Sequence, residues 1–473
     1  MTATIVLCGD RPHIDATEIP DVIAIEGLCR DPARMGTVEI GSSSRIVLVL
    51  HPGSYHLPDV QTALRSIDVD PLGAQIMEAA EEDTPLSLAM ALRGLRDRAS
   101  AFAGSSAEHA KPEFPREMTR RGFFRPLAPA YVAAPLLDHT TCAATDGCQA
   151  CVGVCPQDAY RWQAGKISYD KEACVPCGRC VTTCPTGAIE NPVVTSEMIE
   201  AQVGALVTSW DEPIGIRFVC SRGALHHRPE WFDIAVPCSS MVPGSWLLAC
   251  LLIGAGAATA IPCGESGCPL GLDQGAIEAN DYASSVLAGC GLESGMVIGE
   301  SVFEPIRGGG VDDPFARNRA PDVLVALAAL TEQTMDVTHP AADMGVVQID
   351  EVVCTMCGQC AKTCPTHALV EAYDGNLVTL SFDARACVNC TQCVSSCPEL
   401  ERGAIALEGR VSIELLAGGR RDLNRGSVAM CEICGKAIAP DSMMDRIEDV
   451  LGEEFEVTAA ILRNRCLDCR GRR

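Results

Sequence analysis

The sequence predicts a multidomain protein of mixed α/β and α+β class, and three observations lead to this prediction. The chain has 473 residues, which at typical domain sizes corresponds to about three to five domains. Short apolar runs of strand length alternate with helical patterns in two separate regions. Cysteine occurs 28 times, and most of these cysteines lie in short clusters that are repeated along the chain.

The first region, residues 1–104, is predicted to form an N-terminal α/β domain. Helical patterns are expected at about 60–67 and 85–102, after three apolar runs with the length and composition of strands. These runs are Ile5–Leu7, Val22–Ile25 and Ile46–Leu50. Residues 105–138 are rich in Pro, Ser and Gly and are predicted to form a linker.

A second, central α/β region covers residues 198–305. The apolar run from Trp246 to Ile261 is shorter than the roughly 20 residues of a membrane span, so we interpret it as a buried helix that leads into a strand. A second linker, residues 306–345, contains one apolar helix near 322–331. The predicted strands are Ile214–Val219, Ile234–Val236, Thr259–Ile261 and Met296–Ile298.

Two segments of the chain each carry two runs of four cysteines. In the later segment, residues 346–412, both runs have the spacing C-x2-C-x2-C-x3-C followed by proline. The earlier segment, residues 139–197, has one regular run and one in which five residues separate Cys142 from Cys148. This spacing, in a chain long enough to bury ordinary cores, favours metal ligation in a reducing compartment over disulfides.

These runs resemble those of bacterial two-cluster ferredoxins, in which the fourth cysteine of each run ligates the other cluster. The resemblance implies four 4Fe–4S clusters, in two ferredoxin-like domains that flank the central α/β domain. Structural zinc is the alternative, but zinc chemistry does not require the proline. The implied ligand sets of the earlier segment are Cys142, Cys148, Cys151 and Cys184, and Cys174, Cys177, Cys180 and Cys155. Those of the later segment are Cys354, Cys357, Cys360 and Cys397, and Cys387, Cys390, Cys393 and Cys364.

Four further cysteines follow predicted strand ends in the central domain, where ligands collect in open α/β sheets. The segments IGIRFVC (214–220), VPCSS (236–240), LIGAGA (252–257) and PCGESGC (262–268) resemble the delta subunit of methyl-viologen-reducing hydrogenase. That subunit usually has a second cysteine close after the first, where this chain has Ser221-Arg222-Gly223. Buried structural cysteines are the alternative to a cluster. The resemblance implies a 2Fe–2S cluster, with the candidate ligands Cys220, Cys238, Cys263 and Cys268.

The N-terminal region faintly resembles the N-terminal domain of the heterodisulfide reductase A family. The residues that carry this resemblance are LCGD (7–10), EGLC (26–29) and VLVLHPGSYHL (47–57). That family places several cysteines here near a cluster, whereas this chain has only Cys8 and Cys29, with His51 and His56 as further candidates. Two cysteines do not make a standard cluster site, so a degenerate docking domain is favoured over a cofactor site.

The last segment, residues 413–473, contains two C-x2-C pairs separated by a stretch of helical length. This pattern predicts a small module that needs a structural zinc ion in order to fold. A rubredoxin-like iron or a cluster is the alternative. The predicted ligands are Cys431, Cys434, Cys466 and Cys469.

The charge and the motifs together predict the function. With 37 basic and 62 acidic residues the net charge is −25, which disfavours binding to nucleic acid or to an anionic membrane. No secretory signal is visible, so a cytoplasmic location is expected. We expect a non-catalytic electron-transfer subunit that connects the redox subunits of an oxidoreductase complex, such as a hydrogenase, formate dehydrogenase, flavoprotein or heterodisulfide reductase-like enzyme. The alternative is an oxidoreductase with its own flavin or thiol-reactive site at Cys220 or Cys263.

Overall fold

The computed structural model describes residues 2–9, 22–37, 45–78, 85–113, 129–222, 230–263, 268–298, 301–306, 310–331, 333–451 and 456–470. The chain forms two compact units. The first unit comprises Met1–Thr141, Val154–Arg161 and Ser168–Gln333. The second comprises Cys142–Gly153, Trp162–Ile167 and Thr334–Arg473. The architecture is mixed α/β and multidomain, as predicted.

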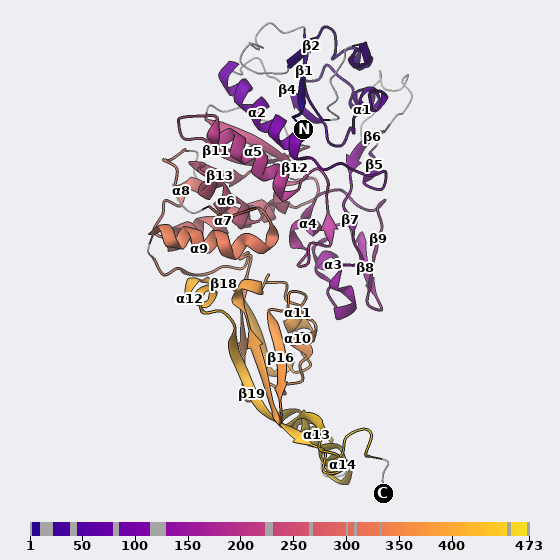
Figure 1. The fold of residues 1–473 in the computed structure, drawn as a ribbon, viewed down its shortest axis with the longest axis vertical. Helices are drawn as coiled ribbons and strands as arrows, with labels where there is room; N and C mark the ends of the chain where they lie inside the picture. The colour runs from indigo at the N-terminus through magenta and orange to yellow at the C-terminus, as the bar shows by residue number, and fades with distance from the viewer. Residues whose placement is uncertain are drawn as a thin grey trace. The chain divides into compact units, whose positions relative to one another are not determined.

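The N-terminal part of the first unit is a parallel sheet of order β2-β1-β3-β4 (Figure 1). Alternate residues of β1 and β3 face α1 on one side of the sheet and α2 on the other, which explains their unbroken apolar sequences. The three predicted strands and both predicted helices are confirmed, whereas β4 was missed because its sequence, QIME, is half polar. The elements are β1 (Thr4–Cys8), β2 (Val22–Ile25), η1 (Pro32–Thr37), β3 (Ile46–Leu50), α1 (Leu57–Ser66), β4 (Gln75–Glu78) and α2 (Pro85–Ala101).

The central part of the first unit is a second parallel sheet, of order β12-β11-β13. The run from Trp246 forms the buried helix α6 and then β13, as predicted. The predicted strand Met296–Ile298 is wrong, because these residues form the short helix α8; periodicity does not distinguish a strand from a buried helical turn in so short a run. The elements are α5 (Ser196–Thr208), β11 (Gly215–Cys220), β12 (Trp231–Val236), η4 (Ser239–Met241), α6 (Gly244–Ile253), β13 (Ala257–Ala260), α7 (Asp273–Gly289), α8 (Gly295–Ile298), η5 (Arg317–Arg319) and α9 (Ala320–Thr331).

Helices α2 and α5 connect these two parts of the first unit, and Figure 1 shows them side by side. Arg98 of α2 is buried between them. Its guanidinium donates to the Gln202 side-chain oxygen at 2.9 Å and to the Val193 carbonyl at 2.9 Å. Both terminal nitrogens of this buried guanidinium are thus hydrogen-bonded, and the two bonds hold the N-terminal domain against the central domain.

The predicted linker 105–138 and the earlier cysteine-rich segment are built from short elements. Part of the predicted linker 105–138 is ordered, because β5 and β6 pair with each other and β7 pairs with β10; residues 114–128 lie outside the described part. The elements are β5 (Ala110–Glu113), β6 (Ala130–Ala133), β7 (Leu136–Leu137), η3 (Ala143–Asp146), α3 (Ala150–Val154), β8 (Tyr160–Gln163), β9 (Lys166–Tyr169), α4 (Arg179–Thr183) and β10 (Ile189–Glu190).

The second unit contains two antiparallel sheets, of order β14-β18-β15 and β16-β17-β19-β20. Strand β19, from the predicted C-terminal module, pairs with β17 of the later cysteine-rich segment, so the two share one sheet (Figure 1). The strands are β14 (Asp336–Thr338), β15 (Gly345–Ile349), β16 (Leu369–Asp374), β17 (Leu377–Phe382), β18 (Ile405–Ser412), β19 (Arg421–Met430) and β20 (Ala437–Pro440). The helices are α10 (Gln359–Lys362), η6 (Ala384–Ala386), α11 (Gln392–Ser395), η7 (Leu400–Arg402), α12 (Ile413–Gly418), α13 (Asp441–Leu451) and α14 (Glu456–Asn464).

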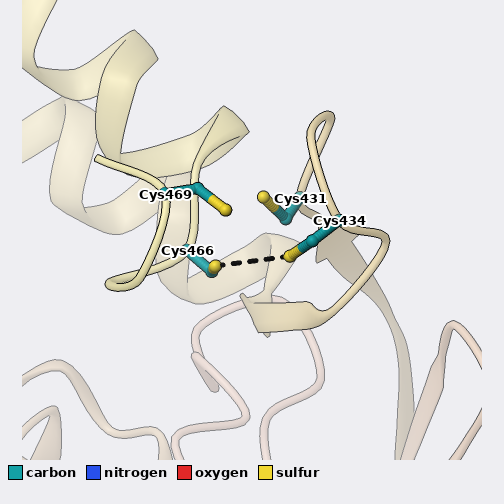
Figure 2. Close-up of side chains that lie close together, drawn as sticks. All are labelled: Cys431, Cys434, Cys466 and Cys469. Carbon is teal, nitrogen blue, oxygen red and sulfur yellow. Dashed lines mark hydrogen bonds between the residues drawn. The ribbon is translucent and has the colours of Figure 1, made fainter. Parts of the chain in front are cut away.

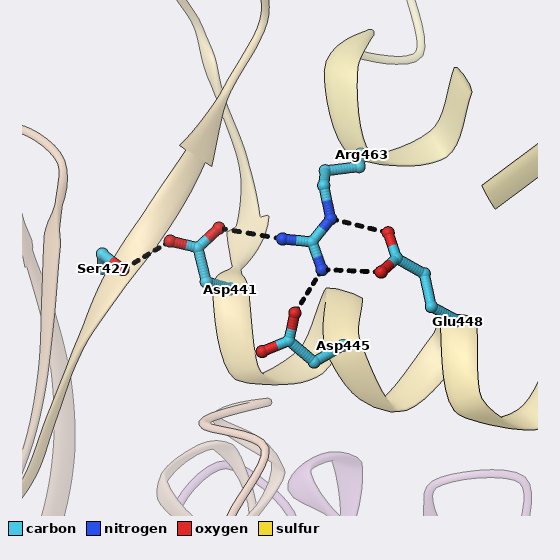
Figure 3. A network of polar contacts seen from close by, with 5 residues as sticks. All are labelled: Ser427, Asp441, Asp445, Glu448 and Arg463. Atoms are coloured by element: carbon cyan, nitrogen blue, oxygen red, sulfur yellow. Dashed lines mark hydrogen bonds and ion pairs between the residues drawn. The ribbon is translucent and has the colours of Figure 1, made fainter. Parts of the chain in front are cut away.

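A polar network around Arg463 joins the last two helices to this sheet (Figure 3). Arg463 of α14 donates to Glu448 of α13 at 2.6 Å and also binds Asp445. It lies 3.7 Å from Asp441, which accepts a hydrogen bond from Ser427 of β19. One guanidinium therefore fixes both helices relative to the strand.

None of the helices in the described part of the chain combines the length and the apolar character needed to cross a membrane.

We predict that removing one partner of the buried pair in the central sheet destabilises this domain. Arg217 of β11 donates to Asp233 of β12 at 2.6 Å, and their side chains are only 8% and 7% exposed. Arg217→Leu should lower the local unfolding free energy by about 3–5 kcal/mol, because it removes the cation that neutralises a buried carboxylate. Hydrogen exchange of β11 and β12 peptides measures this. The double variant Arg217→Met/Asp233→Leu should lose much less stability, and equal losses in both would contradict the explanation.

Candidate metal centres

Two cavities in the later cysteine-rich segment are each lined by four cysteines. In each, three cysteines come from one run and the fourth from the other. The first, about 410 Å³ including space open to solvent, is lined by Cys354, Cys357, Cys360 and Cys397. The second, about 300 Å³, is lined by Cys387, Cys390, Cys393 and Cys364. The structure therefore brings together both sets that the ferredoxin resemblance implies.

Left-handed backbone positions curl both cysteine loops around these cavities. Met356 and Gly358 flank Cys357 with φ of 54° and 69°, and Asn389 and Thr391 flank Cys390 with φ of 51° and 61°. Three of these four residues are not glycine, and non-glycine residues adopt such angles at a cost, typically where function requires it. The same strain occurs at the same place in both loops. We infer that placing the cysteines around the cavity requires this backbone conformation.

The surroundings of the thiols disfavour their charged form. Burial raises the pKa of Cys360 to about 12 and that of Cys387 to about 11. Apolar side chains such as Leu380 and Phe382 line the two cavities. A bound metal centre would supply the positive charge that buried thiolates need, so four thiols in an apolar shell fit a 4Fe–4S cluster.

Hydrogen bonds, one of them from outside the cysteine run, partly offset this burial in the first cavity. Burial raises the pKa of Cys354, whereas the Met356 N–H and the Asn424 side chain lower it by hydrogen bonding. The Met356 N–H lies 3.5 Å from the Cys354 sulfur. Asn424 belongs to β19, far along the sequence, and no motif pointed to it.

In the earlier segment, one predicted set lies within the first unit. Burial, and then the charges of neighbouring cysteines including Cys155, raise the pKa values of three thiols. Each of these three thiols is therefore influenced by Cys155, which comes from the other run. The set is Cys155, Cys174, Cys177 and Cys180.

Residues that the sequence did not single out surround this set. The Tyr160 hydroxyl donates to the Cys180 sulfur at 3.5 Å, and the Tyr160 ring stacks on Tyr169 with centroids 4.8 Å apart. The Lys111 ammonium, from the predicted linker, donates to the Cys174 carbonyl at 2.5 Å and lowers the pKa of the Cys174 thiol. Lysine in a polar linker is normally solvated, so only the tertiary structure reveals this contact.

The irregular run contains a compact insertion. Its extra residues form the short helix η3, which follows Cys142, and Gly147 ends it in the left-handed conformation. Cys142, Cys148 and Cys151 belong to the second unit, whereas Cys184 belongs to the first. This fourth ligand set therefore stays a prediction.

The fourth cysteine of two runs has the same neighbour, a threonine two residues later. The Thr186 hydroxyl lies 3.7 Å from the Cys184 sulfur, and the Thr366 hydroxyl lies 3.8 Å from the Cys364 sulfur. Towards a metal-bound thiolate, a hydroxyl acts as the donor. Both Cys-Pro-Thr turns thus place a hydrogen-bond donor on a candidate ligand.

The four cysteines of the central domain also come together, around the carboxyl ends of β11, β12 and β13. Burial, followed by the charges of Cys220 and Cys268, raises the pKa of Cys263 to about 12. The charge of Cys220 also raises the pKa of Cys238, after the larger effect of burial. Asp273, at the start of α7, accepts hydrogen bonds from the backbone N–H groups of Cys263 and Cys268 at 2.7 and 2.5 Å.

The four C-terminal cysteines form the tightest group. Their sulfur atoms all lie within 4.8 Å of one another, and those of Cys434 and Cys466 are 3.6 Å apart. Figure 2 shows the four side chains converging from two facing loops. Hydrogen bonding from the Cys466 backbone is the main cause that lowers the pKa of Cys431, to about 6, and favours its thiolate. The arrangement fits one metal ion.

Comparison with known protein families identifies the cysteine-rich segments. Residues 166–189 match a 4Fe-4S binding domain, and residues 346–398 match a 4Fe-4S dicluster domain. No curated protein matches the chain. The chain therefore contains two ferredoxin-type regions, which imply iron–sulfur clusters and indicate an electron-transfer role.

We predict that Thr366→Val lowers the reduction potential of the centre that Cys364 ligates. Loss of the hydroxyl donor leaves more charge on the sulfur, which disfavours the more negative reduced state. Redox titration monitored by EPR measures the shift. Thr366→Ser, which keeps the hydroxyl, is the matched control; an unchanged potential in Thr366→Val would contradict the assignment.

Proposed function

We propose that this chain is an electron-transfer subunit that relays electrons between the catalytic subunits of a multi-subunit oxidoreductase. It would carry four 4Fe–4S clusters on the sixteen cysteines of the two ferredoxin-type regions. It would also hold a 2Fe–2S cluster in the central domain and a zinc ion at the C-terminal cysteines. The C-terminal zinc would be structural, since all four positions are filled by protein thiolates.

One observation carries this proposal: two of the candidate sites meet inside the first unit. Cys177 of the ferredoxin-type set packs in the same buried cluster as Cys238 and Cys268 of the central set, around Leu272. The charge of Cys177 also contributes to raising the pKa of Cys238, after burial and the charge of Cys220. Two metal-ligand sets in contact form a short path for an electron.

Further contacts hold these two sites in place. Thr182 of α4 donates to the Met241 carbonyl of η4 at 2.7 Å. A Cβ atom at Gly178 would lie 2.6 Å from the Met241 sulfur, so a larger residue here would displace the end of the Met241 side chain. Gly178 also has φ of 78°, which glycine adopts readily. The cysteine loop and the central domain therefore pack closely against each other.

The ligand sets support electron transfer over catalysis. When bound, 4Fe–4S clusters supply one-electron transfer, and four cysteine ligands leave no cluster position open to a substrate. The apolar residues of the described cavities exclude water and the loops fix the thiols.

We propose a hydrogenase, formate dehydrogenase or heterodisulfide reductase-like enzyme, or a flavoprotein, as the partner. Its docking face would be basic, to complement the net charge of −25. A reducing compartment, the cytoplasm, fits the many free thiols.

The sulfur spacing at the C-terminal site favours a single ion over a cluster. Sulfurs bound tetrahedrally at about 2.3 Å from zinc lie about 3.8 Å apart. The 3.6 Å between Cys434 and Cys466 matches this value. A cluster would place its own atoms between the ligands and would hold the sulfurs farther apart. We favour zinc over a single iron because closed four-cysteine sites of two C-x2-C pairs are typical of structural zinc.

We predict that the anaerobically purified chain contains about eighteen irons, from four 4Fe–4S clusters and one 2Fe–2S cluster. Cys360→Ser should reduce the iron content by about four and remove one EPR-active centre. Cys250→Ala is the control: Cys250 is fully buried in α6 and is not among the candidate ligands, so the iron content should not change. A full complement of iron in Cys360→Ser would contradict the ligand assignment.

The same preparation tests the function itself. Acid release should yield no flavin, and the chain alone should pass electrons from a low-potential donor to an artificial acceptor without turning over a catalytic substrate. Sustained substrate turnover by the single chain, or a stoichiometric flavin, would instead support an enzyme with its own site in the central domain.

We predict that Cys466→Ser removes the C-terminal zinc and unfolds α13 and α14 without loss of iron. A small module whose ligands come from two loops gains much of its folding free energy from the metal. Zinc analysis and hydrogen exchange of these helices measure both effects. Ser442→Ala, in the same module, should keep the zinc content of the parent, and an unchanged zinc content in Cys466→Ser would overturn the assignment.

A further inference from the structure

Three side chains meet at one edge of the N-terminal sheet, apart from every site described above. Cys8 is the last residue of β1, Cys29 lies in the turn after β2, and His51 directly follows β3. These three strands are parallel neighbours in the order β2-β1-β3. Their carboxyl ends therefore lie at the same edge, the place where open α/β sheets bind ligands.

The turn after β2 carries Cys29 back over the end of β1. The Gly9 N–H donates to the Ile25 carbonyl at 2.8 Å, which extends the pairing of the two strands by one residue. Gly27, with φ of 69°, then reverses the chain, and its carbonyl accepts from the Arg30 and Asp31 N–H groups. This tight turn places the Cys29 side chain next to Cys8.

Backbone donors aim at both sulfur atoms. The Cys29 N–H lies 3.4 Å from the Cys8 sulfur, and the His51 N–H lies 3.2 Å from the Cys29 sulfur. The His51 Nδ1 atom is itself 3.2 Å from the Cys29 sulfur. N–H groups directed at sulfur stabilise the thiolate form, which is the form that binds metals.

The spacing of the three ligand atoms fits a single ion. All three lie within 4.8 Å of one another. A sulfur at about 2.3 Å and a nitrogen at about 2.0 Å from a tetrahedral zinc ion lie about 3.5 Å apart, close to the observed 3.2 Å. A cluster would need more room between the ligands and usually a fourth thiolate.

The surroundings also fit a site without net charge. Cys8 and Cys29 are 5% and 4% exposed and belong to the apolar cluster that contains Leu28 and Leu50. Two thiolates, one neutral imidazole and one divalent ion sum to zero charge, so the loaded site can be buried without a further counter-ion. His51 is partly exposed and gives the ion a path to solvent.

We propose that Cys8, Cys29 and His51 bind a single zinc ion at the carboxyl edge of the N-terminal sheet. A donor set of two thiolates and one imidazole binds zinc in preference to magnesium or calcium. A ligand from outside this trio completes the tetrahedron. The site goes beyond the proposed electron-transfer function and does not depend on it.

Zinc and iron per chain, measured on the anaerobically purified full-length protein and its variants, test the site. His51→Ala should lower the zinc content by about one ion per chain, because two ligands hold zinc too weakly to survive purification, and should leave iron unchanged. His51→Cys supplies a third thiolate at the same position and should keep the zinc. The matched control is His56→Ala, whose exposed imidazole lies 3.2 Å from Asp59 and not among these ligands; its zinc content should equal that of the parent.

Several results would overturn the proposal. Unchanged zinc in His51→Ala would exclude His51 as a ligand, and loss of zinc in His51→Cys would show that the imidazole has a structural role only. Loss of iron in place of zinc would indicate a cluster, and a Cys8–Cys29 disulfide in the parent protein would indicate a redox pair. Because each variant is compared with its parent, failure of the C-terminal zinc assignment would not affect the result.

Discussion

The burial of cysteine thiols in apolar surroundings is the constraint on which this structure depends. Burial raises the pKa of Cys174, Cys360 and Cys393, so these side chains are poor thiolates unless a cation joins them. The loops that present them contain strained left-handed residues such as Asn389 and Thr391. Metal binding would offset both costs together, so we expect cluster insertion and folding of these regions to be coupled.

The two parallel sheets of the first unit place cysteines in the same way. In each sheet, cysteines lie at the carboxyl ends of adjacent strands, and a residue that follows the strands contacts them. In the central sheet, Asp273 orients the Cys263 and Cys268 loop through its carboxylate. In the N-terminal sheet, the His51 backbone and imidazole face Cys29. The α/β architecture thus supplies candidate ligand positions in addition to those of the ferredoxin-type regions.

Local signals in the sequence were sufficient for much of the fold and for the cysteine sets. The apolar runs of β1 and β3 are buried on both faces and were recognised directly, as was the partly exposed β2. The resemblance to two-cluster ferredoxins implied which thiols meet around the two cavities. Contacts between distant segments could not be predicted. Lys111, in a predicted linker, contacts Cys174, and Asn424, in strand β19, contacts Cys354. Tertiary packing brings these residues to the cysteines, and no local sequence pattern indicates it.

Strand β19 has a consequence for the order in which the protein can be assembled. Its neighbour β17 contributes Leu380 to the wall of one cavity and Phe382 to the wall of the other. During synthesis, all eight cysteines of that region leave the ribosome before Arg421, the first residue of β19. Until then β17 has one unpaired edge, and the Asn424 donor to Cys354 does not yet exist. Clusters inserted during translation would therefore enter an unfinished compartment, which β19 later closes.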